Sequence, residues 1–157
     1  MLDFSPHIIN FLPINLFDDA SDMSQFIDYR QLRPVLKQNI DKSKNADPNI
    51  LVCVRFMPFC NMEGYEQHIL GTWQHIYDWF DWNPELCGSY LIEYLNKFNT
   101  TEEILRYLGK YGSRSFERSY ECIKFHYEKS KKCLNCKYYL ICDGVEKTKN
   151  SRLLDSI

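Results

Sequence analysis

The sequence predicts an α/β fold that starts with a strand–helix–strand unit and ends in helices and a cysteine-knuckle metal-binding segment. Three observations support this prediction. Two short apolar runs flank an amphipathic stretch, apolar residues then recur at helical spacing, and three cysteines fall within residues 133–142 near the end of the chain. With 157 residues, of which 45% are hydrophobic and 25% charged, the chain is long and apolar enough to bury a core.

The first unit is predicted from two apolar runs and the helix between them. Residues 7–12 (HIINFL) are followed by proline and are too short a run to favour a helix, so we expect a buried strand. Residues 29–43 carry apolar side chains at helical spacing, and Pro34 is expected to mark the first turn or a kink. Residues 50–57 (ILVCVRFM) are rich in β-branched residues and predict a second buried strand. A strand, a helix and a strand in this order indicate parallel pairing.

Polar residues follow the second predicted strand. Ligands of α/β folds gather at the carboxyl ends of parallel strands, and the segment PFCNMEGYE lies at such an end. Glu63 and Glu66 flank Gly64 there and are candidates to bind a substrate amine or the amino group of a methionine-derived cofactor, although solvated loop carboxylates are more common. Cys60 is either a metal or substrate contact or a packed thiol.

Helices are predicted for the second half of the chain. A helical pattern begins at residue 67, another short helix is expected near residues 89–98, and Thr100 and Glu103 form a capping box for a third. Ser113 is expected to cap a fourth. His68 and His75 share one face of the first of these helices, but seven residues correspond to a rise of about 10 Å, which is too far to chelate one metal.

Composition excludes several classes of function. A net charge of −2 gives no support for broad nucleic-acid binding, and no apolar run reaches the roughly 20 residues of a membrane span. The N-terminal residues MLDFSPHIINF lack the pattern of a signal peptide, so we expect a cytoplasmic protein. Seven cysteines, an odd number, are then expected to be metal ligands or packed thiols instead of disulfides.

The cysteine knuckle is the most specific signal. Cys133 and Cys136 form a C-x2-C turn, in which backbone N–H groups can hydrogen-bond the thiolates, and Cys142 follows as a third ligand. Three close thiolates with one open position suit a [4Fe-4S] cluster. Zinc is the alternative if Cys122, His126 or Cys60 supplies a fourth ligand. The remaining possibility is three thiols that bind no metal. Cys53 and Cys87 are expected to be structural.

Two segments resemble a known family. VRFMPFCNMEGYEQHILG with the DWFDWN stretch, and KCLNCKYYLICDG, resemble the C-terminal portion of a radical S-adenosylmethionine (radical SAM) enzyme with a SPASM or twitch-type auxiliary cluster domain. The resemblance implies that residues 1–85 are the end of a partial (β/α) barrel and residues 86–157 a helical segment with the cluster. It assigns Cys133, Cys136 and Cys142 as ligands of an auxiliary [4Fe-4S] cluster in an oxidoreductase.

The sequence departs from that family at two places. The C-x3-C-x2-C motif that holds the SAM-cleaving cluster is absent, and Glu146 stands where the SPASM pattern has a further cysteine. We therefore expect a fragment or truncated relative that does not cleave S-adenosylmethionine alone and that has a companion chain carrying the rest of the barrel. The fourth ligand is Cys60, Cys122, a substrate atom or none, and the substrate is a peptide or a small metabolite. The other hypotheses are a zinc-stabilised, non-catalytic interaction module and a metal-free remnant.

Overall fold

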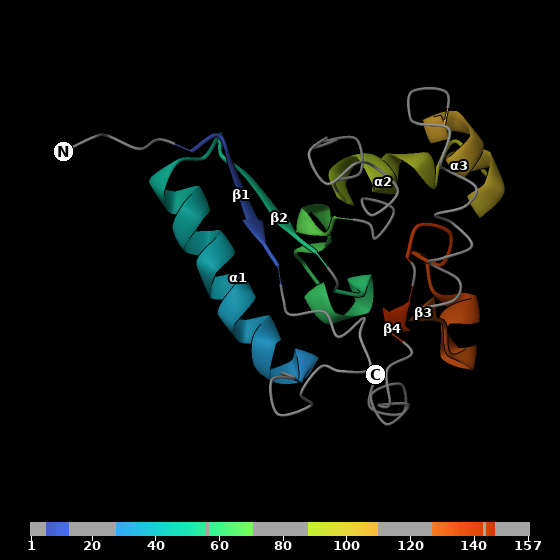
Figure 1. Cartoon of the computed structure of the whole chain (residues 1–157), viewed down its shortest axis with the longest axis horizontal. Helices are drawn as coiled ribbons and strands as arrows, with labels where there is room; N and C mark the ends of the chain where they lie inside the picture. Colours follow the sequence, from blue (N-terminus) through green and yellow to red (C-terminus); the bar gives the residue numbers. More distant parts are fainter. Residues whose placement is uncertain are drawn as a thin grey trace, which may run out of the picture.

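The structure is a computed structural model. The structure describes residues 6–12, 28–55, 57–70, 88–109, 127–142 and 144–146. Figure 1 shows the order of the elements, with the sheet and its long helix on one side and the C-terminal segment beside the two shorter helices.

The predicted strand–helix–strand unit is present. Strands β1 (Ile8–Phe11) and β2 (Leu51–Val54) pair in parallel, with Ile8 opposite Leu51 and Phe11 opposite Val54. Helix α1 (Tyr29–Ala46) connects them and runs alongside the sheet (Figure 1). The strands form because their β-branched and aliphatic side chains fit a pleated, half-buried surface. The parallel pairing predicted from the sequence is confirmed, whereas the barrel remnant stays a prediction.

Local chemistry explains where α1 begins and which face it buries. The Asp28 carboxylate caps the helix by accepting a 2.8 Å hydrogen bond from the backbone N–H of Arg30, whose guanidinium also binds it. This side-chain hydrogen bond lowers the pKa of Asp28. Leu36 and Ile40 are four residues apart and are both buried, as helical spacing requires. Pro34 lies inside the helix, beyond its first turn.

The α-helix expected from residue 67 does not begin there. The chain forms two 3-10 turns, η2 (Phe59–Met62) and η3 (Glu66–His68), and Ile69 then makes a parallel bridge to Val54 of β2. Because Ile69 is 1% exposed, its burial against the sheet outweighs the helical pattern of the sequence. Residues 71–87 lie outside the described residues, and so do the remainder of that predicted helix, the DWFDWN stretch, His75 and Cys87.

Two helices follow as predicted. Helix α2 (Gly88–Tyr94) begins against η3 so closely that a Cβ atom on Gly88 would lie 2.0 Å from the Glu66 carbonyl oxygen. Helix α3 (Thr101–Gly109) has the expected capping box: the Thr100 hydroxyl accepts from the N–H of Glu103, and the Glu103 carboxylate accepts from the N–H of Thr100. The helix predicted after Ser113 lies outside the described residues.

The buried apolar side chains form one core that spans the chain. It joins Ile40 of α1 and Val52 of β2 to Ile104 of α3 and Ile141 near the C-terminus. This core therefore crosses the boundary that the sequence places near residue 85. No helix in the described ranges combines the length and the apolar character that a membrane crossing needs.

Candidate metal centre

A two-stranded hairpin closes the base of the cysteine segment. Strand β3 (Tyr127–Glu128) pairs antiparallel with β4 (Val145–Glu146), and the 3-10 turn η6 (Lys131–Asn135) lies between them. Gly144 permits this pairing because its φ is +94°, and a Cβ atom there would lie 1.9 Å from the Glu128 carbonyl oxygen. The three cysteines of the C-x2-C-x5-C motif are thus held in one closed loop.

Successive tight turns place the three cysteines. The N–H of Cys133 donates to the Ser130 carbonyl (3.0 Å), and the N–H of Cys136 donates to the Cys133 carbonyl (2.9 Å). After a further turn, the N–H of Cys142 donates to the Tyr138 carbonyl (2.9 Å). The N–H groups of the three cysteines are therefore each satisfied by a backbone carbonyl a few residues earlier.

Each of the three sulfurs has a local hydrogen-bond partner. The N–H of Tyr138 donates to Sγ of Cys136 at 3.5 Å, and the N–H of Gly144 donates to Sγ of Cys142 at 3.4 Å. In both cases the donor lies two residues after the cysteine. The Ser130 hydroxyl lies 3.5 Å from Sγ of Cys133. Such contacts stabilise thiolates and tune metal centres. The two backbone donors follow Cys136 and Cys142, whereas the sequence predicts donors within the turn between Cys133 and Cys136.

The side chains between Cys136 and Cys142 fix this loop on the core. Ile141 is fully buried, and Tyr138 is 8% exposed. The ring of Tyr138 stacks on Phe59 of η2, with centroids 5.0 Å apart, and its hydroxyl donates to the Glu66 carboxylate at 3.0 Å. The cysteine loop is therefore attached to the segment that follows β2, next to Cys60.

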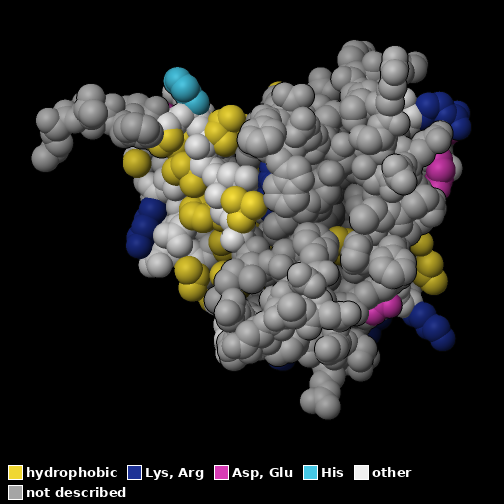
Figure 2. Space-filling model, viewed as in Figure 1, with side chains coloured by type: hydrophobic (Ala, Val, Ile, Leu, Met, Phe, Trp, Pro, Cys, Tyr) yellow, Lys and Arg dark blue, Asp and Glu magenta, His cyan; other side chains and the backbone are white. Residues whose placement is uncertain are grey.

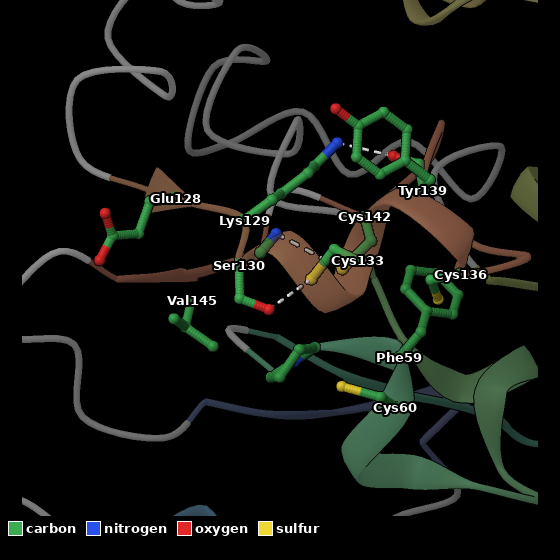
Figure 3. Close-up of a pocket in the computed structure, with 12 residues that line it drawn as sticks. Phe59, Cys60, Glu128, Lys129, Ser130, Cys133, Cys136, Tyr139, Cys142 and Val145 are labelled. Atoms are coloured by element: carbon green, nitrogen blue, oxygen red, sulfur yellow. Dashed lines mark hydrogen bonds between the residues drawn. The ribbon is translucent and has the colours of Figure 1, made fainter. Parts of the chain in front are cut away.

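Cys60 and the three loop cysteines line one pocket (Figure 3). Cys60 comes from η2, and its side chain projects into the space below the loop that carries Cys133, Cys136 and Cys142 (Figure 3). The remaining wall includes Pro58, Phe59, Glu128, Lys129, Ser130, Tyr139, Gly144 and Val145. Four thiols from two distant parts of the sequence thus face a common space.

The electrostatics of the pocket agree with this proximity. Although Cys60 is exposed by area, burial against the pocket wall raises the pKa of its thiol, and the nearby thiols of Cys136 and Cys133 raise it further. Lys129 is the cation of the wall. Its ammonium donates to the Tyr139 carbonyl at 2.6 Å and lies 4.2 Å from the centre of the Tyr139 ring.

The arrangement differs from a preformed site for a single ion. Among the described residues, no three Cys, His, Asp or Glu side chains converge on one metal position. Tetrahedral zinc with Zn–S bonds near 2.3 Å would hold its sulfurs about 3.8 Å apart. The donor set is therefore four thiols that line one pocket, and thiolates are ligands that both zinc sites and iron–sulfur clusters use.

The other predicted site residues lie as follows. Glu63 is exposed, and its backbone carbonyl accepts a hydrogen bond from the Lys37 ammonium. Glu66 accepts from Tyr138, so in this structure its carboxylate serves the docking of the cysteine loop. Cys53 is fully buried in β2, as expected for a structural thiol. Cys122 and His126 lie outside the described residues.

Sequence reasoning missed the wall of the pocket opposite Cys60. The run of residues 129–132 suggests a solvated basic stretch, yet Lys129 and Ser130 line the pocket. The sequence signal that could have found Ser130 is its position three residues before the first cysteine, where the turn brings its hydroxyl beside the sulfur.

The chain was also compared with known proteins. Comparison with protein-family models, with curated proteins and with solved structures finds no match to this chain.

Proposed function

We propose that this chain binds a [4Fe-4S] cluster. Cys133, Cys136 and Cys142 are the ligands from the knuckle loop, and Cys60 is the fourth ligand from η2. The observation that carries the proposal is that all four thiols line one pocket, while backbone N–H groups donate to the sulfurs of Cys136 and Cys142 and the Ser130 hydroxyl contacts that of Cys133. Zinc with the same four thiols is the alternative.

The residues around the pocket would bind the cluster, offset its charge and exclude water from it. The thiolates bind it, and the N–H groups of Tyr138 and Gly144 offset their negative charge. The buried side chains of Ile141 and Val145 keep one side of the loop dry, which favours a defined potential. When bound, the cluster would supply one-electron chemistry or a point of attachment for a substrate atom.

In the wider proposal, the chain is the C-terminal part of a radical SAM oxidoreductase. The C-x2-C-x5-C spacing and the parallel β1–β2 unit support it. The cleaving cluster and S-adenosylmethionine would belong to a companion chain that carries the rest of the barrel, since C-x3-C-x2-C is absent here. Glu63 is the exposed carboxylate left to contact a peptide or small-metabolite substrate, because Glu66 is bonded to Tyr138.

The test is metal analysis of protein purified without oxygen. We expect four irons and four sulfides per chain, with the broad sulfur-to-iron absorption of such clusters and an electron paramagnetic resonance signal after reduction. Cys136→Ala should abolish loading, whereas Cys53→Ala, a buried thiol of β2, should leave it intact. Cys60→Ala should retain three ligands and lower the iron content.

Two outcomes would contradict the proposal. Stoichiometric zinc without sulfide would instead support the zinc-stabilised interaction module. Equal iron loading in the Cys136 and Cys53 variants would show that the knuckle does not hold the metal.

A further inference from the structure

Lys129 differs from the lysines that follow it, because its side chain turns back onto its own segment. It comes directly after β3 and is half-buried, whereas Lys131 and Lys132 are exposed. Figure 2 shows how Lys and Arg side chains at the left and right edges of the molecule project into solvent. Among the described residues of the pocket wall, Lys129 is the only Lys or Arg. Because lysine is seldom buried unless it is paired, its partners indicate what it does there.

The ammonium of Lys129 holds the middle of the segment between Cys136 and Cys142. It donates to the Tyr139 carbonyl at 2.6 Å (Figure 3) and lies 4.2 Å from the centre of the Tyr139 ring. Tyr139 is three residues from each of the two cysteines, and its own N–H donates to the Cys136 carbonyl at 2.9 Å. The ammonium therefore ties the residue that follows β3 to the turn that leads into Cys142.

The aliphatic stem of Lys129 lies beside the backbone that follows Cys142. A Cβ atom on Gly144 would be 3.1 Å from Cγ of Lys129, so the stem borders the space that a side chain at Gly144 would take. The N–H of Gly144 in turn donates to Sγ of Cys142 at 3.4 Å. Lys129 thus contacts the chain three residues before Cys142 and two residues after it.

We propose that Lys129 is a positioning residue that holds the thiol of Cys142 in the pocket. Its ammonium restrains the backbone before this cysteine, and its stem lies against the glycine whose N–H donates to the sulfur. A thiol that is held in place binds a metal more tightly, because less conformational freedom is lost on binding. The placement of Cys142 stands on these contacts alone, whereas its consequence for metal binding rests on the proposed function.

The first experiment measures how fast each cysteine of the reduced, metal-free full chain reacts with iodoacetamide, with mass spectrometry to resolve the sites. Lys129→Met keeps an aliphatic stem beside Gly144 and removes the ammonium. We expect alkylation of Cys142 to become about three- to tenfold faster, as the loss of one ordinary hydrogen bond implies. Cys133 should react at its wild-type rate, because its N–H and its sulfur contact Ser130 instead.

Matched variants separate this contact from a general effect on the fold. Lys129→Arg keeps a cation that can donate to the Tyr139 carbonyl and lie over its ring, so it should restore slow alkylation of Cys142. Lys44→Met removes a lysine of α1 that also donates to backbone carbonyls, outside the pocket wall, and should leave Cys142 unchanged. Cys53 is fully buried in β2, so its alkylation reports whether the fold stays closed.

The second experiment tests the consequence for the metal centre. Chain that has been purified without oxygen is titrated with a chelator, and the iron or zinc that remains bound is measured. Lys129→Met should lose half of its metal at an about tenfold lower chelator concentration, the low end of the effect of residues that orient metal ligands. Lys129→Arg should keep its metal as the wild type does.

The results that overturn this inference differ from those that overturn the metal centre. Unchanged alkylation of Cys142 in Lys129→Met would overturn it. Equal acceleration at Cys53 and Cys142 would also overturn it, because Lys129 would then support the whole fold instead of one thiol. A chain that purifies without iron, sulfide or zinc would contradict the proposed function, and the alkylation rates would still decide the role of Lys129.

Discussion

Tyr138 joins the cysteine loop to the segment that carries Cys60, and its removal should separate the two halves of the candidate site. The ring stacks on Phe59 at a centroid distance of 5.0 Å, and the hydroxyl donates to Glu66 at 3.0 Å. Glu66 lies 72 residues before Tyr138, so this pair crosses between distant parts of the chain. Two substitutions can divide the contact into its hydrogen bond and its ring packing.

The expected magnitudes follow from these contacts. Tyr138→Phe keeps the stacked ring and loses the hydrogen bond to the Glu66 carboxylate. Since Glu66 is only half-buried, we expect this loss to cost about 1.5 kcal/mol, the low end of the range for hydrogen bonds to charged groups. Tyr138→Leu also loses the aromatic pair with Phe59, which adds about 0.5–1.5 kcal/mol. The free energy of unfolding should therefore fall in two steps.

The assay is urea denaturation followed by circular dichroism, with iron content measured in parallel. A double-mutant cycle of Tyr138→Phe with Glu66→Ala should give a coupling energy of about 1 kcal/mol. Tyr138→Phe should retain iron loading because the ring still holds η2 against the loop, whereas Tyr138→Leu should lower it.

Additive effects in this cycle would refute the hydrogen bond as a link between the two segments. Full iron loading of Tyr138→Leu, at unchanged stability, would refute the view that this ring places Cys60 beside the loop.

Two further predictions concern His68 and Gly144. Burial lowers the pKa of His68 below 6.5, and its ring nitrogen Nδ1 lies 2.8 Å from the Val52 carbonyl. Between the folded pKa and about 6.5, the unfolded chain therefore binds more protons than the folded chain. The free energy of unfolding should then fall as the pH drops through this range. Urea denaturation at pH 7.5 and 5.5 should show a smaller drop for His68→Gln than for the wild type, and an equal drop would contradict this assignment. An alanine at positive φ costs roughly 1–2 kcal/mol of folding free energy. Gly144→Ala should cost more than this, because its new Cβ would also meet the Glu128 carbonyl oxygen. Gly64→Ala, at positive φ with open space around it, should cost only that amount. Equal losses in thermal denaturation would show that the contact with Glu128 relaxes.

Much of the local structure was predictable from the sequence. Short β-branched runs bounded by proline and asparagine indicated β1 and β2, and the spacing of Leu36 and Ile40 indicated the buried face of α1. The capping box of Thr100 and Glu103 fixed the start of α3 within a residue. Each of these signals acts over a few residues, where local sterics and backbone hydrogen bonds decide the outcome.

Predictions from local spacing were wrong where a segment contacts a strand that lies far away in the sequence. The helical pattern of the sequence begins at residue 67, yet Ile69 forms a bridge to Val54 that buries its side chain on the sheet. At this point a tertiary contact outweighs a weak local preference. A sequence pattern cannot report this competition, because the partner strand lies elsewhere in the chain.

The sequence by itself determined which thiols gather in the candidate site: three cysteines at C-x2-C-x5-C spacing, too close in the chain to lie far apart. Only the structure gave the backbone donors two residues after Cys136 and Cys142. Only the tertiary structure decided that Cys60 faces them, because stacking of Tyr138 on Phe59 brings η2 against the loop. The physical reason is that turns are set by neighbouring residues, whereas a contact across more than 70 residues depends on the burial of side chains in a shared core.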